Sequence, residues 1–306
     1  MAAFLLRRFL ASIVVLFFAV SLTFLLTRSL RGGPFDKEKQ GSAQVQEAIA
    51  AKYKLNGTLW QQYGAYLNDL AHLDLRVSTR YRDWTVAEVL GQKLTSSLLL
   101  GGIAFVIASI FGVLIGAVAA MRRDRWIDWG AMFGALLAIS IPSFITGPLL
   151  VAVFGLWLGW LPIGGWGSVE HLILPSICLA APYVAYVARL MRNSLLDVLK
   201  SDFLRTARAK GLGEAQALAR HAMKVAILPV VTYLGPLAAH LLTGSMVVES
   251  VFNISGAGSI FVNAIQNRDP FLLCGAVVVY CVLLVFFNFI VDVLYSVLDK
   301  RIRLYA

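Results

Sequence analysis

The sequence predicts an all-α integral membrane protein, with about six membrane-spanning helices in a single domain that covers residues 1–306. Composition is the first observation: 59% of the residues are hydrophobic and 14% are charged, whereas soluble domains are about half apolar and a quarter charged. The second is a series of apolar runs long enough to cross a bilayer, and the third is the gathering of Lys and Arg in alternate connections. The net charge of +10 is therefore interpreted by position, and not as a sign of nucleic-acid binding.

The first apolar run, Phe9–Thr27, follows Arg7 and Arg8. No small-x-small cleavage site comes directly after it, so we expect a retained span and not a signal peptide. We expect Pro142 and Pro148 to break the third span, and the prolines of the spans to need neighbouring groups in a packed bundle. The other expected spans are Leu98–Met121, Trp129–Leu158, Leu172–Leu190, Leu228–Val248 and Phe271–Leu298.

Residues 31–94 are expected to form an extracytoplasmic insertion between the first and second spans. The segment carries both signs of charge and contains two pieces of helical character, Ser42–Tyr53 and Leu59–Leu73. It is too polar to cross a membrane and too long for a turn. Its Lys and Arg do not oppose an outer location, because long loops translocate largely regardless of charge. The insertion either helps to receive an outer partner or caps the bundle.

The positive charges predict the orientation. Lys and Arg precede the first span, separate the second from the third and the fourth from the fifth, and follow the last, whereas the connection Gly159–His171 has none. Because cytoplasmic loops are enriched in Lys and Arg, both termini are expected in the cytoplasm. Tryptophans at both expected interfaces fit aromatic belts: Trp157, Trp160 and Trp166 outside, and Trp126 and Trp129 inside.

The longest polar interval between spans is Asp202–Pro229, which nearly coincides with an expected cytoplasmic loop at 200–227. Its alanines, leucines, arginines and lysines favour helix, whereas Gly211 and Gly213 separate two helical pieces. A helix, a turn and a second helix at the membrane surface form an element on which a cytoplasmic partner can dock. A basic loop that binds lipid headgroups is the alternative.

Motifs of catalysis are missing from the sequence. Neither GxxxxGK[ST] nor HExxH occurs, so the usual phosphate-binding loop and the usual zinc-protease helix are excluded. Cys178, Cys274 and Cys281 lie within apolar runs and are expected to be small buried residues without a metal. An enzyme is therefore disfavoured.

Three ionisable residues fall within expected spans or at their ends. His240 lies near the middle of the fifth span, Glu249 at its outer end, and Asp292 in the inner half of the last. Such groups are functional-site hypotheses because burying them in a membrane is costly. Structural roles are the favoured alternative, with Asp292 paired near Lys300 and Arg301, and His240 bonded to a neighbouring helix.

The interval Phe203–Gly211, with the later Leu-Pro at 228–229, resembles the EAA loop of binding-protein-dependent ABC importer permeases. Arg205 and Thr206 stand where the family has Glu and its first Ala, and residues 253–258 replace a Pro-Gly-Leu/Ile-Gly turn. Further stretches are similar to the peptide and nickel branch and cover nearly the whole chain, and the similarity is to its first, B-type permease subunit. These stretches are FLLRRFLASI, GGPF, AKYKLN, ISIPSF, VVESVF with NRDPF, and FNFIVDVLYSVLDKRIR.

The resemblance implies the type I ABC importer permease fold with its transmembrane helices, in the inner (cytoplasmic) membrane of a bacterium. It also implies peptide import by alternating access. The implied partners are a C-type permease in a heterodimer, two ABC ATPase subunits that bind ATP and Mg, and an extracytoplasmic peptide-binding protein. No cofactor is implied in this chain. ATPase coupling is implied for Arg205, Thr206, Ala207, Arg208, Ala209, Lys210 and Gly211.

A bend in the fifth span is expected to face the translocation path, followed by an outer gate loop, Glu249–Arg268. The path or gate residues are then Gly235, Pro236, His240, Gly244, Ser245 and Glu249. A secondary carrier or channel that works without ATPases is the alternative of a different class, although carriers more often show inverted repeats and several buried charges. Dipeptides and nickel are the alternative substrates.

Overall fold

The computed structural model describes residues 2–29, 51, 53, 57–81 and 84–298. Within these ranges the secondary structure is helical, and the sole β-contact is an isolated bridge between Val77 and Thr85. The long helices and the short ones packed beside them are α1 Ala2–Ser29, α3 Leu59–Ala71, α4 Val86–Met121, α5 Trp126–Ser140, α6 Ser143–Leu150, α7 Glu170–Leu199, α11 Leu228–Leu242, α12 Met246–Val251, α13 Gly258–Gln266 and α14 Pro270–Leu298. Between α7 and α11 lie α8 Asp202–Ala209, α9 Glu214–Ala217 and α10 Met223–Ala226.

The membrane-spanning character of the chain is confirmed. Five helical segments are long and apolar enough to cross a bilayer, and the pair α5 and α6, bent by 107°, makes up to 6 if it is one broken span. The break falls at Pro142, which precedes the first residue of α6, as predicted. Pro148 does not break the helix: it lies inside α6, and the residues after it are wound as a π-helix, Val151–Trp157. A local change of winding is a known way for a helix to absorb a lost hydrogen bond.

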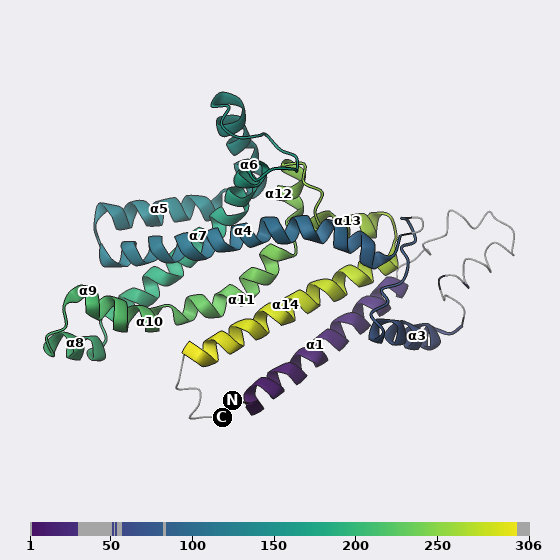
Figure 1. Ribbon diagram of the computed structural model, residues 1–306, viewed down its shortest axis with the longest axis horizontal. Helices are drawn as coiled ribbons and strands as arrows, with labels where there is room; N and C mark the ends of the chain where they lie inside the picture. The colour runs from purple at the N-terminus through teal and green to yellow at the C-terminus, as the bar shows by residue number, and fades with distance from the viewer. Residues whose placement is uncertain (1, 30–50, 52, 54–56, 82–83, 299–306) are drawn as a thin grey trace.

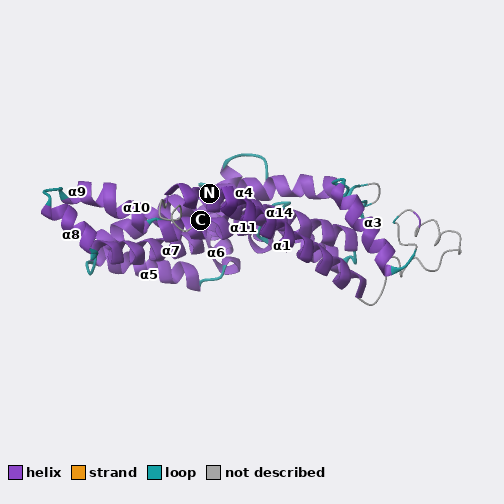
Figure 2. Cartoon of the chain, turned by 90° about the horizontal axis from the view of Figure 1, so that it is seen from below, coloured by secondary structure: helices purple, strands orange, loops and turns teal. Residues whose placement is uncertain are grey.

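The helices form a flattened slab (Figures 1 and 2). α4 packs along α7, α11 lies against both α4 and α14, and α1 runs antiparallel beside α14. Small residues allow the close approach of α4 and α7: a Cβ atom on Gly112 would meet the Val187 side chain at 2.6 Å. Packing through small residues is typical of membrane bundles, where apolar burial alone does not hold helices together.

One end of the slab carries α3, α13 and the starts of α4 and α14, and the opposite end carries α8 and α9 (Figure 1). α4 begins at Val86, well before the predicted span at 98, so the predicted insertion at 31–94 includes the first turns of this helix. Thr85 and Glu88 form a capping box there, which satisfies the first free N–H groups. The predicted helical piece Leu59–Leu73 corresponds to α3, whereas the piece 42–53 lies almost wholly outside the described residues.

At the end of the slab with α3 and α13, the connections are tied to the helices by buried carboxylates. Asp269 caps α14 by accepting a hydrogen bond from the Leu272 N–H at 3.0 Å, and it also accepts from the Ser78 hydroxyl at 2.5 Å. Arg76 donates to Asp69 at 2.8 Å, and both side chains are buried. This end of the molecule is therefore built as a packed unit and not as a loose loop.

Candidate functional site

The basic interval forms a helical hairpin, as predicted. α8 ends at Ala209, the chain turns through Lys210 to Gly213, and the return runs through α9, a π-helical stretch Leu218–Ala222, and α10. Gly211 has a φ of +85°, which residues with a Cβ rarely adopt. Its N–H donates to the Arg208 carbonyl at 2.9 Å, and this bond closes the turn. We call residues 202–226 the basic hairpin.

The basic hairpin is attached by its apolar side and presents its basic side. Leu204 is fully buried and Ala207 is 9% exposed, whereas the other predicted coupling residues of α8 and the turn are exposed. The Arg205 side chain is 74% exposed, and its pair with Asp202 at 3.6 Å lies on the surface, where such pairs stabilise little. The hairpin projects from the end of the slab (Figure 1) and can enter a groove that carries acidic groups.

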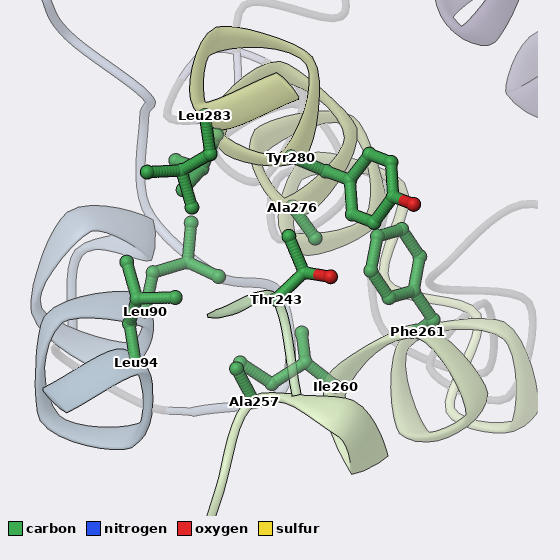
Figure 3. A pocket seen from close by; sticks show the side chains of 10 residues that line it. Leu90, Leu94, Thr243, Ala257, Ile260, Phe261, Ala276, Tyr280 and Leu283 are labelled. Atoms are coloured by element: carbon green, nitrogen blue, oxygen red, sulfur yellow. The ribbon is translucent and has the colours of Figure 1, made fainter. Parts of the chain in front are cut away.

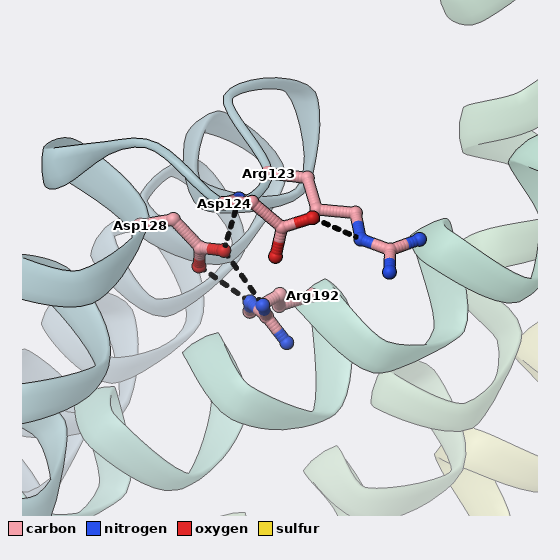
Figure 4. A network of polar contacts seen from close by, with 4 residues as sticks. All are labelled: Arg123, Asp124, Asp128 and Arg192. Carbon is pink, nitrogen blue, oxygen red and sulfur yellow. Dashed lines mark hydrogen bonds and ion pairs between the residues drawn. The ribbon is translucent and has the colours of Figure 1, made fainter.

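A buried ion pair lies where α5 begins (Figure 4). Arg192 of α7 donates from Nε to Asp128 Oδ1 at 2.6 Å and from Nη2 to Asp128 Oδ2 at 2.7 Å. The Asp124 N–H donates to the same carboxylate at 3.1 Å. The Asp128 side chain is 4% exposed. This two-bond geometry fixes the start of α5 on α7, and the sequence analysis did not predict it.

At the end of the slab that the charges predict to be outside, Glu249 is buried in a hydrogen-bond network that joins three helices. Its Oε1 accepts from the Ser97 hydroxyl at 2.6 Å, and its Oε2 accepts from the Gly258 N–H at 2.9 Å. Ser97 Oγ in turn accepts from the Ala257 N–H at 2.7 Å. The network therefore ties α4, α12 and the start of α13, and we call it the outer clasp.

The outer clasp explains two glycines in the predicted gate region. The Gly244 φ is +92°, and a Cβ there would meet Glu249 Oε1 at 2.6 Å and Ser97 Oγ at 2.8 Å. A Cβ on Gly256 would collide with the Glu249 carboxylate itself. Gly244 therefore packs against the clasp, and its place on the translocation path stays a prediction.

The other predicted path residues are divided between two places. Ser245 caps α12, its side chain accepting from the Val248 N–H at 3.4 Å, and so belongs with the clasp. Gly235 is buried within α11, whereas Pro236 and His240 are exposed on one side of it. His240 contacts the ring of Tyr183 on α7. Asp292 lies in α14, but its side chain and its expected pairing with residues 300 and 301 lie outside the described residues.

A pocket beside the clasp is small and apolar (Figure 3). Its cavity volume is about 20 Å³, which is room for about one water molecule and not for a peptide. Thr243 and Tyr280 supply its polar atoms, and Leu90, Ile260 and Phe261 are among its apolar walls. The pocket is therefore a packing defect between α4, α13 and α14. In the described residues no group of three or more His, Cys, Asp or Glu side chains could hold a metal ion.

Residues 112–304 match the family model described as "Binding-protein-dependent transport system inner membrane component". The chain is 41% identical to the oligopeptide transport system permease protein OppB of Haemophilus influenzae, over 99% of this chain and 100% of the relative. It is 39% identical to the dipeptide transport system permease protein DppB of Bacillus subtilis, over 100% of this chain and 99% of the relative.

Two solved structures share the fold. The MetNI methionine ABC transporter in inward-facing conformations matches with a TM-score of 0.53 and 15% identity, over 69% of this chain and 96% of that one. An amino acid ABC transporter matches with a TM-score of 0.51 and 19% identity, over 76% of this chain and 97% of that one. These matches confirm the predicted type I importer permease fold, and the sequence relatives confirm the predicted resemblance.

Proposed function

The chain belongs to the family of binding-protein-dependent transport system inner membrane components, and from this premise we propose that it is half of the translocation path of an ATP-driven oligopeptide importer. The family is that of the membrane-spanning permease subunit of ABC importers. The oligopeptide permease relatives, aligned from end to end, support peptides as the substrate class. The dipeptide permease relative makes dipeptides the second candidate.

The observation that carries the proposal is the basic hairpin. A permease without a phosphate-binding loop needs a rigid element through which separate ATPases can move it, and the hairpin is exposed, helical and anchored by Leu204 and Ala207. The proposed partners are two ABC ATPases that bind ATP and Mg, a C-type permease, and an extracytoplasmic peptide-binding protein. Acidic groups of an ATPase groove would pair with Arg205, Arg208 and Lys210.

The charge distribution supports a cytoplasmic position for both termini and for the hairpin, in a bacterial inner membrane. The hairpin lies at the same end of the slab as the turn between α4 and α5, which contains Arg122, Arg123 and Arg125. The outer clasp lies at the opposite side of the layer, where a binding protein would deliver peptide. Opening of an outer gate would then strain or break the contacts of Glu249.

The test compares two charge reversals in chains purified from native membranes. Arg205→Glu with Lys210→Glu alters the hairpin, and Arg122→Glu with Arg125→Glu alters exposed residues of the neighbouring turn as a matched control. Ala207 is left unchanged because it is buried and its replacement would disturb the fold. We expect the hairpin variant to lose the co-purified ATPase activity and the control to keep it.

Uptake of labelled peptides of different lengths by the reconstituted complex then identifies the substrate. Preference for peptides longer than two residues supports the oligopeptide assignment, and preference for dipeptides supports the second candidate. If the wild-type chain elutes alone and still moves solute in liposomes, the importer proposal is wrong and a carrier independent of ATPases takes its place.

A further inference from the structure

The exposed side of α11 differs from the exposed sides of the other spanning helices. Its exposed residues Pro229, Thr232, Pro236 and His240 recur every three or four positions and include no Leu, Ile, Val or Phe; the Thr232 hydroxyl donates to the Leu228 carbonyl at 3.0 Å, so His240 is the polar group of this face without a bond inside the helix. Residues at this spacing share one face of a helix. A face that meets lipid tails is apolar, because unpaired polar groups are costly in hydrocarbon.

The contrast is internal to the molecule. On α14 the exposed residues at the same spacing are Val282, Phe286 and Ile290, and on α4 they include Val106, Ile110 and Phe111. Those faces suit lipid. On the half of α7 nearer the hairpin, in contrast, the exposed residues are Tyr186, Arg189, Asn193 and Asp197, so polar residues continue from the exposed side of α11 onto its neighbour.

Two aromatic contacts join the polar faces of α7 and α11. Tyr183 meets His240 edge to face, with ring centroids 5.7 Å apart, and Tyr186 meets Tyr233 with centroids 4.5 Å apart. In the described part of the chain, the three hydroxyls and the imidazole make no hydrogen bond. These four polar groups therefore have no hydrogen-bond partner in the described part of the chain, and polar groups at membrane depth need one.

We propose that Tyr183, Tyr186, Tyr233 and His240 form the strip of this chain that contacts the peptide during translocation, an assignment that rests on the proposed function. The hydroxyls and the imidazole can donate to and accept from backbone amides, and the ring faces can pack against side chains of any kind. Toward the hairpin the strip is followed on α7 by the exposed Arg189 and, two turns later, by the exposed Asp197. The strip therefore binds the backbone amides that all peptides share and does not distinguish between peptide sequences.

The experiment uses the assembled complex with the binding protein, ATP and tetra-alanine as substrate. Single cysteines replace Tyr186 or His240 in a background in which Cys178, Cys274 and Cys281 are replaced and peptide uptake is retained. Phe111→Cys and Phe286→Cys are matched controls, since these side chains are 53% and 54% exposed against 47% for Tyr186. A charged methanethiosulfonate reagent that does not enter lipid is applied during turnover.

We expect labelling at 186 and 240 to be about tenfold faster or more than at 111 and 286, because the reactive thiolate forms only where water reaches it. Saturating tetra-alanine should slow the labelling at 186 and 240 alone. Labelling as slow as in the controls would overturn the proposal, because it would place the strip in lipid or in a dry contact with the second permease. Rapid labelling at 186 and 240 that saturating tetra-alanine does not slow would also overturn it, because water but no peptide would then reach the strip. If the wild-type complex imports no peptide at all, the proposed function fails before the strip is tested.

Discussion

The ion pair between Asp128 and Arg192 allows a prediction with an internal control. Arg192→Leu leaves the carboxylate buried with a single hydrogen bond, from the Asp124 N–H. Breaking a buried pair on one side costs about 3–5 kcal/mol, and the 21% exposure of the Arg192 side chain places the expected loss near the lower value, about 3 kcal/mol. The control is Arg123→Leu, which breaks the exposed pair with Asp124 and should cost about 0–1 kcal/mol.

The assay is denaturant unfolding of the purified chain in detergent, followed by tryptophan fluorescence. The loss of unfolding free energy in Arg192→Lys should lie between the losses in Arg192→Leu and Arg123→Leu, because an ammonium cannot reproduce the two parallel bonds of a guanidinium. The double variant Asp128→Asn with Arg192→Leu should recover part of the loss, since no buried charge is left unpaired. If Arg192→Leu unfolds at the same denaturant concentration as Arg123→Leu, the pair does not hold α5 on α7 and the reasoning is refuted.

Three further predictions concern the outer clasp and the two turns. Ser97→Ala should lower the free energy of unfolding by about 1–3 kcal/mol, because it leaves the Ala257 N–H without its acceptor and Glu249 without one donor; an unchanged unfolding midpoint would contradict this. Gly211→Ala should lower the free energy of unfolding by about 1–2 kcal/mol because of the positive φ alone, since no atom lies within 4 Å of the new Cβ. Thermal unfolding of the variant measures this loss. Gly244→Ala should lower the free energy of unfolding by clearly more than Gly211→Ala does, because a clash with the Glu249 carboxylate adds to the same backbone strain. Equal losses for the two variants would show that the clasp rearranges to make room for the new Cβ.

The parts of the fold that the sequence predicts are those that depend on local pattern. Apolar runs of spanning length, the break at Pro142 and the glycine that ends α8 each follow from a few neighbouring residues. The sequence predicted a span from Leu98 and not the helix start at Val86, because the first turns of α4 carry Glu88, Gln92 and Lys93. Those residues are too polar for a membrane but favour a helix that extends beyond it.

The parts that could not be predicted depend on contacts between distant segments. Asp128 and Arg192 stand in different helices, and each alone resembles an ordinary charge at a membrane surface. The contact of Gly244 with Ser97 could not be predicted, because the two residues are far apart in the chain. One signal was present in the sequence: Pro229, Thr232, Pro236 and His240 recur at helical spacing. On the inference above, that pattern marks the side of α11 that faces the translocation path.

The flattened shape of the slab has a consequence for the cargo (Figure 2). On the proposed function, the route for the peptide is a seam between two walls, of which this chain is one and the second permease the other. This path widens when the two permeases move apart, so its width is set by the distance between the two proteins and not by the side chains of either. Peptides of different bulk can then pass without any residue being replaced. The strip of Tyr183, Tyr186, Tyr233 and His240 then needs only to contact the backbone that all peptides share.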